Sequence, residues 1–256
     1  MRYGECSIKA DVAYVLPISD IHIGDKAFDG IGYSKLCDNV EWVRNEPNAR
    51  VFLNGDILNV ATRSSASSPA AQSMNLQAQV ELAVKIFRPI AEQGKIVGAI
   101  DGNHEDRLMD FVGYSPTTAI CHQLKIPYFK YSAVMVYLVG KGRNTIAYSM
   151  YHHHTTGGGS TPGGKMNRVD KLRQLVANCD CYIGSHNHQL GVIPVTTRTV
   201  DVIHKKIHVV RQLLIDSGSY LQWDDNYSEA KMIPPVKLGS PRIRLNGKKR
   251  DVHVSV

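Results

Sequence analysis

Five short segments hold the side chains whose types and spacing can do chemistry: Asp20-Ile21-His22, Gly55-Asp56, Gly102-Asn103-His104-Glu105, His152-His153-His154 and His186-Asn187-His188. Carboxylate, imidazole and amide ligands without thiolates suit divalent first-row metal ions. Burying so many ionisable groups without partners would cost several kcal/mol each, and a metal centre removes that cost. For the Asn103 segment taken alone, the competing interpretation is a capped turn in which Asn103 or Asp101 bonds its own backbone.

Each of these segments follows an apolar run that predicts a buried β-strand. The runs are short, rich in β-branched residues and bounded by glycine or polar residues. They cover residues 13–19, 51–54, 96–100, 145–151 and 181–184. Asp20 and His22, like His186 and His188, are spaced i, i+2, which on an extended chain points both side chains to one side. The runs therefore deliver polar groups to the same kind of position, just beyond a strand end, where side chains commonly face a ligand.

Helical patterns lie between the first strands. Residues 33–44 and 76–90 have the apolar spacing of helices that pack one face on a core, the second broken near Pro89. Strands alternating with helices predict a largely parallel sheet covered on both faces, hence an α/β fold. Further along, residues 131–139 and 143–151 predict a hairpin, residues 166–177 a helix and residues 191–214 more β-structure. We expect one domain over residues 1–256, with a surface loop or lid at residues 62–72.

A glycine-rich run at residues 157–166 has two interpretations. Residues 159–165 fit the first seven positions of a Walker A phosphate-binding loop, but Met166 stands where the Mg²⁺-binding Ser or Thr is required. A P-loop NTPase is therefore not expected. Backbone N–H groups of the run, together with Lys165, can still approach a phosphate. A flexible connector to the following helix is an equal alternative.

The formal charge of +7 is concentrated in a basic C-terminal segment at about residues 231–256. Its residues 231–250 hold seven Lys and Arg and no acid, whereas the rest of the chain balances 23 bases against 23 acids. Such a segment either binds a polyanion or forms the solvated edge of a sheet, and both interpretations stand equally. The five cysteines, without a Cys-x-x-Cys pair, indicate free thiols in a reducing cytoplasm, that of the host if a phage encodes the chain. Because no apolar run has the length of a membrane span, no membrane partner is expected.

Taken in order, Asp-x-His, Gly-Asp, Gly-Asn-His-Glu, a later His and His-x-His resemble the calcineurin-like metallophosphoesterase family over roughly residues 13–190. The resemblance implies two mixed β-sheets packed face to face and flanked by helices. It also implies two divalent metal ions, Mn²⁺ in the first place, with Fe²⁺, Zn²⁺ or Ni²⁺ as alternatives. The ligands it assigns are Asp20, His22 and His188 on one ion, Asn103 and His186 on the other, and Asp56 bridging both.

The same resemblance assigns the remaining roles. The last ligand is His154, directly before the glycine-rich run, with His152 as the alternative because it points the same way on a strand. Ser185 stands where the family has a glycine before His-x-His, a departure that bears on the geometry of this turn. In the family, water activated by two ions attacks phosphorus, so His104, next to a ligand, is the candidate general acid. Arg107 and Lys165 are the candidate substrate-binding residues that offset phosphate charge.

The substrate class is narrowed by what the motifs lack. Protein phosphatases of the superfamily carry Gly-Asp-x-x-Asp-Arg-Gly, and residues 55–61 lack the second Asp, the Arg and the last Gly. DNA-repair nucleases of the superfamily have an extra capping region, and little chain follows residue 190 to build one. We therefore expect a compact phage- or bacterial-type phosphodiesterase acting on a nucleotide, cyclic or not, or on nucleic acid. The alternatives are a phosphomonoesterase or protein phosphatase, and a non-catalytic binding scaffold; the oligomeric state stays open.

Overall fold

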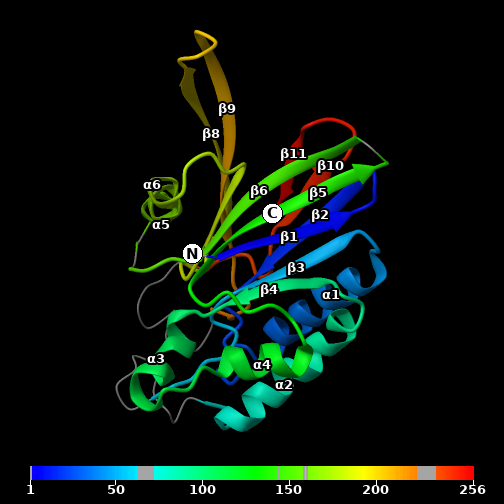
Figure 1. Cartoon of the computed structure of the whole chain (residues 1–256). Coiled ribbons are helices and arrows are strands. Elements are labelled where there is room, and N and C mark those ends of the chain that lie inside the picture. The colour runs from blue at the N-terminus through cyan, green and yellow to red at the C-terminus, as the bar shows by residue number, and fades with distance from the viewer. Residues whose placement is uncertain (1, 63–71, 143, 158, 160, 224–234) are drawn as a thin grey trace.

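The computed structural model describes residues 2–62, 72–142, 144–157, 159, 161–223 and 235–256. Within these residues the chain is an α/β protein with two mixed β-sheets of six and five strands (Figure 1). Residues 63–71 of the expected surface loop lie outside the described residues. Among the described residues, no helix is long and apolar enough to cross a bilayer.

The five-stranded sheet has the order β11-β10-β2-β3-β4. Its strands are β11 (Val252–Ser255), β10 (Arg242–Asn246), β2 (Val12–Ile18), β3 (Ala49–Asn54) and β4 (Ile96–Ile100). Strands β2, β3 and β4 are parallel because helices α1 (Ile31–Asn45) and α2 (Leu76–Ala91) form the crossovers between them. The carboxyl ends of these three strands therefore meet at one edge of the sheet.

The six-stranded sheet has the order β1-β5-β6-β7-β9-β8. Its strands are β1 (Arg2–Ile8), β5 (Ser132–Lys141), β6 (Asn144–His154), β7 (Cys181–Ser185), β9 (Lys206–Ser217) and β8 (Leu190–Asp201). Strands β6, β7 and β9 are parallel, while β5–β6 and β8–β9 are antiparallel. Three strands of this sheet thus also end at a common edge.

Three apolar clusters define the layers. The cluster between the sheets combines side chains from both, among them Phe52, Tyr137 and Ile183. A second cluster packs the other face of the five-stranded sheet against α1, α2 and α4 (Pro116–Leu124). A third packs the six-stranded sheet against α5 (Pro162–Asp170) and α6 (Leu172–Leu175). Helix α3 (Asn103–Val112) begins directly beyond β4, at the strand ends.

Two predicted helices differ from those in the structure. Helix α2 continues past Pro89 to Ala91, since a proline this close to a helix end removes little of the hydrogen bonding. The helix expected from residue 166 begins at Pro162, where the Thr161 hydroxyl accepts a 3.2 Å bond from the Gly164 N–H. The second half of the glycine-rich run is therefore a first helical turn rather than a flexible connector.

The basic C-terminal segment forms a sheet edge where it is described; its residues 231–234 lie outside the described residues. Strands β10 and β11 extend the five-stranded sheet beyond β2. The Arg242 guanidinium lies 4.1 Å from the centroid of the Trp42 ring, and the Arg250 guanidinium lies 2.6 Å from Asp180. These partners within the chain favour the interpretation of the segment as a sheet edge.

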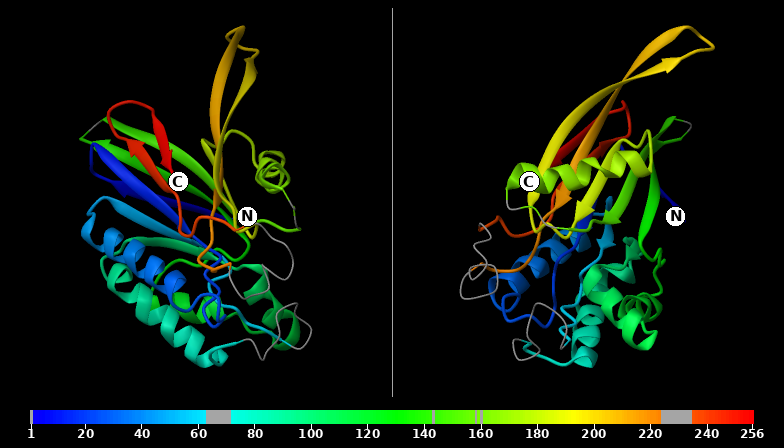
Figure 2. Two further views of the ribbon diagram at one scale, coloured as in Figure 1. Left: turned by 180° about the vertical axis from the view of Figure 1, so that it is seen from behind. Right: turned by 90° about the vertical axis from the view of Figure 1, so that its left-hand side faces the viewer.

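The β8–β9 hairpin projects from the body of the molecule (Figures 1 and 2). Strand β7 pairs with β9 only from Leu213 to Asp216, whereas β8 pairs with β9 along its whole length. Beyond Leu213 the sheet is therefore a ribbon of two strands. The β-structure expected at residues 191–214 is confirmed, but its projection into solvent was not anticipated from the sequence.

Candidate metal centre

All five polar segments of the sequence meet at the carboxyl ends of β2, β3, β4, β6 and β7. The backbone there is strained, because Asp20, His22, Asp56, His186 and His188 all have positive φ angles, between 48° and 79°. Non-glycine residues rarely adopt this conformation, and where they do, the surrounding structure usually enforces it at a functional site. The strain thus falls on five of the residues that the family resemblance assigns as ligands.

The positive φ angles correct the reasoning about the i, i+2 pairs. Strand β2 ends at Ile18 and β7 at Ser185, so neither pair lies on extended chain. Tertiary hydrogen bonds hold the first turn instead: the N–H of Asp20 donates to the carbonyl of Gly55 at 3.1 Å, and that of His22 to the carbonyl of Asp56 at 3.1 Å. The side chains converge because of these turns rather than because of strand alternation.

One group of possible metal ligands consists of Asp20, His22 and His188. The Nε2 atoms of His22 and His188 lie 3.2 Å apart, and His188 Nε2 lies 3.4 Å from Asp20 Oδ1. Two imidazole nitrogens at this distance share one hydrogen bond at most, whereas a cation between such donors satisfies all of them. This donor set fits a divalent first-row metal.

A second group consists of Asp56, His154 and His186. The His154 Nε2 atom lies 3.2 Å from Asp56 Oδ2 and also 3.2 Å from Asn103 Oδ1, so the Asn103 amide joins this group. His152 stays outside every such group among the described residues. Its ring stacks on Phe52 at 3.9 Å between centroids, deep between the sheets.

A third group, His22, Asp56 and His104, overlaps the other two. The His104 Nε2 atom lies 3.9 Å from Asp56 Oδ2, and its backbone N–H donates to Asp56 Oδ1 at 2.9 Å. His104 therefore borders the candidate ligands closely, and its geometry is compatible with both an acid and a ligand.

The electrostatics suit cation binding for part of the candidate set. Burial lowers the pKa of His188 to about 3 and that of His186 to about 4, which keeps both imidazoles neutral and able to bind a cation. Burial opposes the ionisation of Asp56, but the neighbouring imidazoles of His154 and His104 hold the pKa of its carboxyl well below the usual range. Burial raises the pKa of Asp20 to about 7. A nearby cation would favour its ionised form. Burial opposes the protonation of His154, but the carboxylate of Asp56 raises its pKa to about 10, so this imidazole must lose a proton before it can bind a cation.

Glu105 holds the two central turns together, a role that the sequence reasoning missed. Its buried carboxylate accepts backbone N–H bonds from Asp56 at 3.0 Å, Leu58 at 2.8 Å and Gly102 at 2.9 Å. A Cβ atom on Gly102 would overlap Asp56, so only glycine permits this close approach of the turns. The available signal was Glu at the third position of a helix, where such residues bond back to the helix start.

Asn54 and Ser185 orient His154 and were also missed. The Nδ1 atom of His154 lies 3.0 Å from the Asn54 carbonyl and 2.8 Å from the Ser185 hydroxyl, which leaves Nε2 directed at Asp56. The Asn54 amide donates to the Ser185 hydroxyl at 2.9 Å. Ser185, the departure from the family pattern, therefore supplies the kind of partner that fixes the orientation of a metal-binding imidazole.

Arg107 and Lys165 approach the site from two different helices, α3 and α5. The Arg107 Nη1 atom is buried and has no hydrogen-bond partner in the part of the chain that is described, and the charge of Arg107 lowers the pKa of both His104 and His186. Lys165 is buried, and its charge lowers the pKa of His188. Arg107 therefore lies near the second group, and Lys165 lies near the first. We call these two the outer groups, since the third group overlaps both of them.

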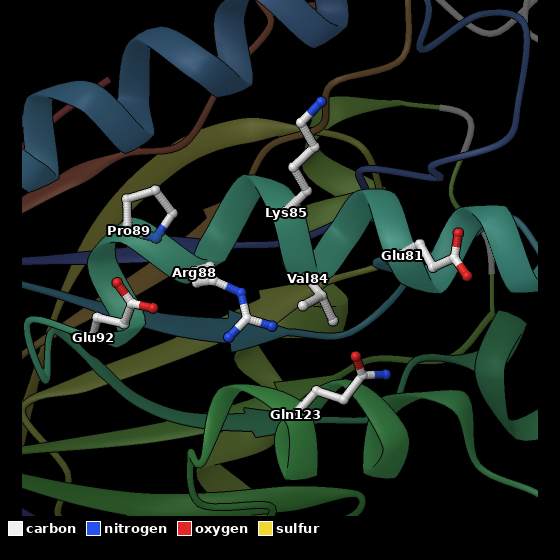
Figure 3. Close-up of a pocket in the computed structure, with 7 residues that line it drawn as sticks. All are labelled: Glu81, Val84, Lys85, Arg88, Pro89, Glu92 and Gln123. Atoms are coloured by element: carbon white, nitrogen blue, oxygen red, sulfur yellow. The ribbon is translucent and has the colours of Figure 1, made fainter.

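Two hollows on the surface lie away from this site. One, of about 420 Å³, is lined by side chains of α2 and by Gln123 of α4 (Figure 3). The other, of about 590 Å³, lies by the β5–β6 turn and Gly247. Neither contains any of the candidate ligands, so we assign no chemistry to them.

Comparisons with known proteins do not add to this geometry. No family model matches the chain, and no curated protein matches it significantly. A function must therefore be argued from the site itself.

Proposed function

We propose that this chain is a phosphodiesterase that depends on two divalent metal ions, in the manner of the calcineurin-like metallophosphoesterases. One observation carries the proposal: the buried Oδ2 atom of Asp56 faces the Nε2 atoms of His154 at 3.2 Å and His22 at 3.8 Å, and no described residue donates a hydrogen bond to it. These imidazoles belong to the two outer groups, so Asp56 stands between them. The two mixed sheets are those expected of that family's fold.

When bound, the ions would supply positive charge that stabilises a phosphoryl group in the transition state and favours the ionisation of water. Asp20, His22 and His188 would hold one ion, and Asn103, His154 and His186 the other, with Asp56 shared. Mn²⁺ suits this mixture of carboxylate, amide and imidazole, and Fe²⁺, Zn²⁺ and Ni²⁺ are the alternatives. Neutral His186 and His188 and an ionised Asp56 need no loss of protons before binding. Asp20 and His154, whose pKa values are raised to about 7 and about 10, would release protons as the ions bind.

His104 would protonate the leaving oxygen. Its Nδ1 atom lies 2.5 Å from the carbonyl of Asn59, a contact that requires a proton on Nδ1. Nε2 would therefore carry the transferable proton in the imidazolium form. Burial lowers the pKa of His104 and opposes this form, whereas the nearby Asp56 carboxylate favours it. Arg107 and Lys165 would offset the charge of the phosphate, since an anion would satisfy the buried Nη1 atom of Arg107, which has no hydrogen-bond partner among the described residues.

A diester is favoured over a phosphoprotein because residues 55–61 lack the Asp and Arg of the phosphatase motif. We place the substrate among nucleotides and nucleic acids, whose backbone is a phosphodiester. A non-catalytic scaffold is disfavoured because the chain keeps every candidate ligand and the candidate acid.

The test measures metal-dependent turnover and compares His188, a candidate ligand, with His204, an exposed histidine outside the site. The purified chain is stripped by chelation and reloaded with Mn²⁺, and turnover of bis-p-nitrophenyl phosphate and p-nitrophenyl phosphate is measured. We expect turnover that is lost on chelation, restored by Mn²⁺ and greater for the diester. His188→Ala should abolish it, whereas His204→Ala, an exposed histidine on the hairpin, should not. A chain that holds two ions and hydrolyses neither compound would contradict the proposal.

A further inference from the structure

The projecting part of the β8–β9 hairpin, residues 195–212, is here called the arm. It begins where β7 stops pairing at Leu213, and seven further residue pairs continue to Asp201 and Lys206. At about 3.3 Å per residue it extends roughly 20 Å beyond the sheet. Figures 1 and 2 show its outer part clear of the body, whereas at its base Gln212 is buried and donates to the carbonyl of Cys179 at 3.0 Å. Two-stranded ribbons are marginally stable alone, so a partner that covers the arm would also stabilise it.

One face of the arm is apolar and cationic. Register places Val200 opposite Ile207 and Arg198 opposite Val209, and side chains of directly opposed residues share a face. The exposed fraction is 71% for Val200 and 66% for Ile207, and it rises at the tip to 80% for Val202 and 87% for Ile203. Such a gathering of exposed aliphatic side chains marks an interaction surface.

The charge of the arm is almost wholly positive. Its cations are Arg198, Lys205, Lys206 and Arg211, all exposed. Its single acid is Asp201, which already contacts His204 at 2.8 Å and His208 at 3.6 Å. In the part of the chain that the structure describes, none of the four cations forms an ion pair. The arm therefore presents an uncompensated positive surface.

This distribution favours one kind of partner over two others. Two copies of the chain joined arm to arm would bring together surfaces of like charge. A membrane would engage the aliphatic tip but leave Arg198, Val209 and Arg211, which lie several residue pairs back, without a partner. A polyanion that runs along the arm engages the whole face.

We propose that the arm binds duplex nucleic acid. A ribbon of two strands has the width that the major groove, about 12 Å across, admits, whereas a wider sheet does not. Cations spread along the ribbon suit successive phosphates, and aliphatic side chains contact sugars, thymine methyl groups or an opened base step. The end of β7 pairing at Leu213 is thus what makes the arm narrow enough to fit.

One continuous strand joins the arm to the candidate metal centre. Strand β9 runs from Lys206 in the arm to Ser217, whose hydroxyl lies 2.6 Å from that of Ser19, which in turn donates to Asp20 at 2.6 Å. The 12 residues of β9 span roughly 40 Å, slightly more than one turn of a duplex at about 34–36 Å. That the bound duplex is also the substrate rests on the proposed function.

The test measures binding without turnover. Affinity for a labelled DNA duplex about three helical turns long is followed by fluorescence anisotropy over a range of salt concentrations, with chelator present. The arm variant combines Arg198→Ser, Lys205→Ser, Lys206→Ser and Arg211→Ser. Its matched control combines Lys9→Ser, Lys85→Ser, Arg88→Ser and Lys171→Ser, which removes the same charge from exposed sites elsewhere.

We expect the arm variant to bind at least tenfold more weakly and its log–log salt slope to fall by about 0.9 for each phosphate that the arm no longer neutralises. The control variant should keep the slope of the wild type. A tip variant, Val202→Ser with Ile203→Ser, should weaken binding with an unchanged slope, because it removes apolar side chains only.

An arm variant with the affinity and slope of the wild type would overturn the proposal. Light scattering and sedimentation with phosphatidylserine vesicles would then assign the arm to a second copy or to a lipid surface. Because binding is measured with chelator present, it is independent of catalysis. A wild-type chain that binds the duplex through the arm but never hydrolyses a diester would refute the proposed function alone.

Discussion

At its carboxyl end, strand β9 delivers Asp216 and Ser217 into a region where carboxylates and imidazoles are buried; at its amino end it carries Ile207 and Val209 into solvent. The metal centre and the arm thus depart in opposite ways from the rule that apolar groups are inside and charges outside. The first buries polar atoms such as Asp56 Oδ2, which accepts no hydrogen bond from the described residues, and the second exposes aliphatic groups. Both departures cost free energy in the isolated chain, and the ligands that we propose would remove the cost in each. Sites of function are where a sequence breaks local rules in this way.

The largest effect is expected at Asp56. Asp56→Asn keeps the shape of the side chain but removes the charge that both outer groups share. Because metal ions contribute several kcal/mol to such reactions, we expect bis-p-nitrophenyl phosphate turnover to fall by at least about 10³-fold. Metal analysis of the same preparation should show fewer than two ions. If the variant binds two ions and keeps wild-type turnover, the proposal that Asp56 is shared by both ions is wrong.

His104 separates chemistry from metal binding. His104→Ala should keep both ions and the fold while turnover of a nucleoside diester falls roughly 10²–10⁴-fold, the usual contribution of a positioned acid. The loss should be much smaller for p-nitrophenyl esters, whose leaving group departs without a proton.

Two other outcomes would change the role of His104. Equal losses on both substrates would mean that it stabilises phosphate charge instead. Loss of an ion would make it a ligand of the third group, with His22 and Asp56.

Ser185 should have an intermediate effect. Ser185→Ala removes a hydroxyl 2.8 Å from His154 Nδ1, and loss of such an orienting partner typically costs about 10–100-fold in metal affinity. Isothermal titration with Mn²⁺ measures this affinity. Ser7→Ala, an exposed serine on β1, is the control. Unchanged affinity in Ser185→Ala would leave the orientation of His154 to the Asn54 carbonyl alone.

The smallest effect is expected in the arm. Because Val202 and Ile203 are 80% and 87% exposed, replacing both by Ser should change the free energy of unfolding by less than about 0.5 kcal/mol. Turnover of bis-p-nitrophenyl phosphate should also be unchanged. Urea denaturation and the turnover assay measure the two quantities. A large loss of stability or of turnover would show that these tip side chains contribute to the folded body or to catalysis, which would contradict the contrast between the two regions.

The sequence predicted the parts of this molecule that depend on local pattern. Apolar runs located β2, β3, β4, β6 and β7, and the polar residues that follow them do converge. The periodicity of α1 and α2 was equally clear, because one face of each helix packs on the core.

Features imposed by tertiary contacts could not be predicted. The left-handed conformations of Asp20 and His22 run against their own preferences and are held by the carbonyls of Gly55 and Asp56. Glu105 gained its role from turns that lie far from it in the sequence. The Val, Ile and Thr content of β8 and β9 indicated strands, but composition does not tell where a neighbouring strand such as β7 ends.

The central claim is that Asp56 joins two ions, and electron paramagnetic resonance of the Mn²⁺-loaded chain tests it most directly. Two ions bridged by one carboxylate are exchange-coupled, so the account predicts two Mn²⁺ per chain and a coupled spectrum. If the two groups bind Mn²⁺ cooperatively, a chain loaded with one equivalent of Mn²⁺ should show the coupled spectrum in a fraction of the molecules. A chain that takes up a single ion, or two that give only the hyperfine pattern of isolated Mn²⁺, would contradict the account.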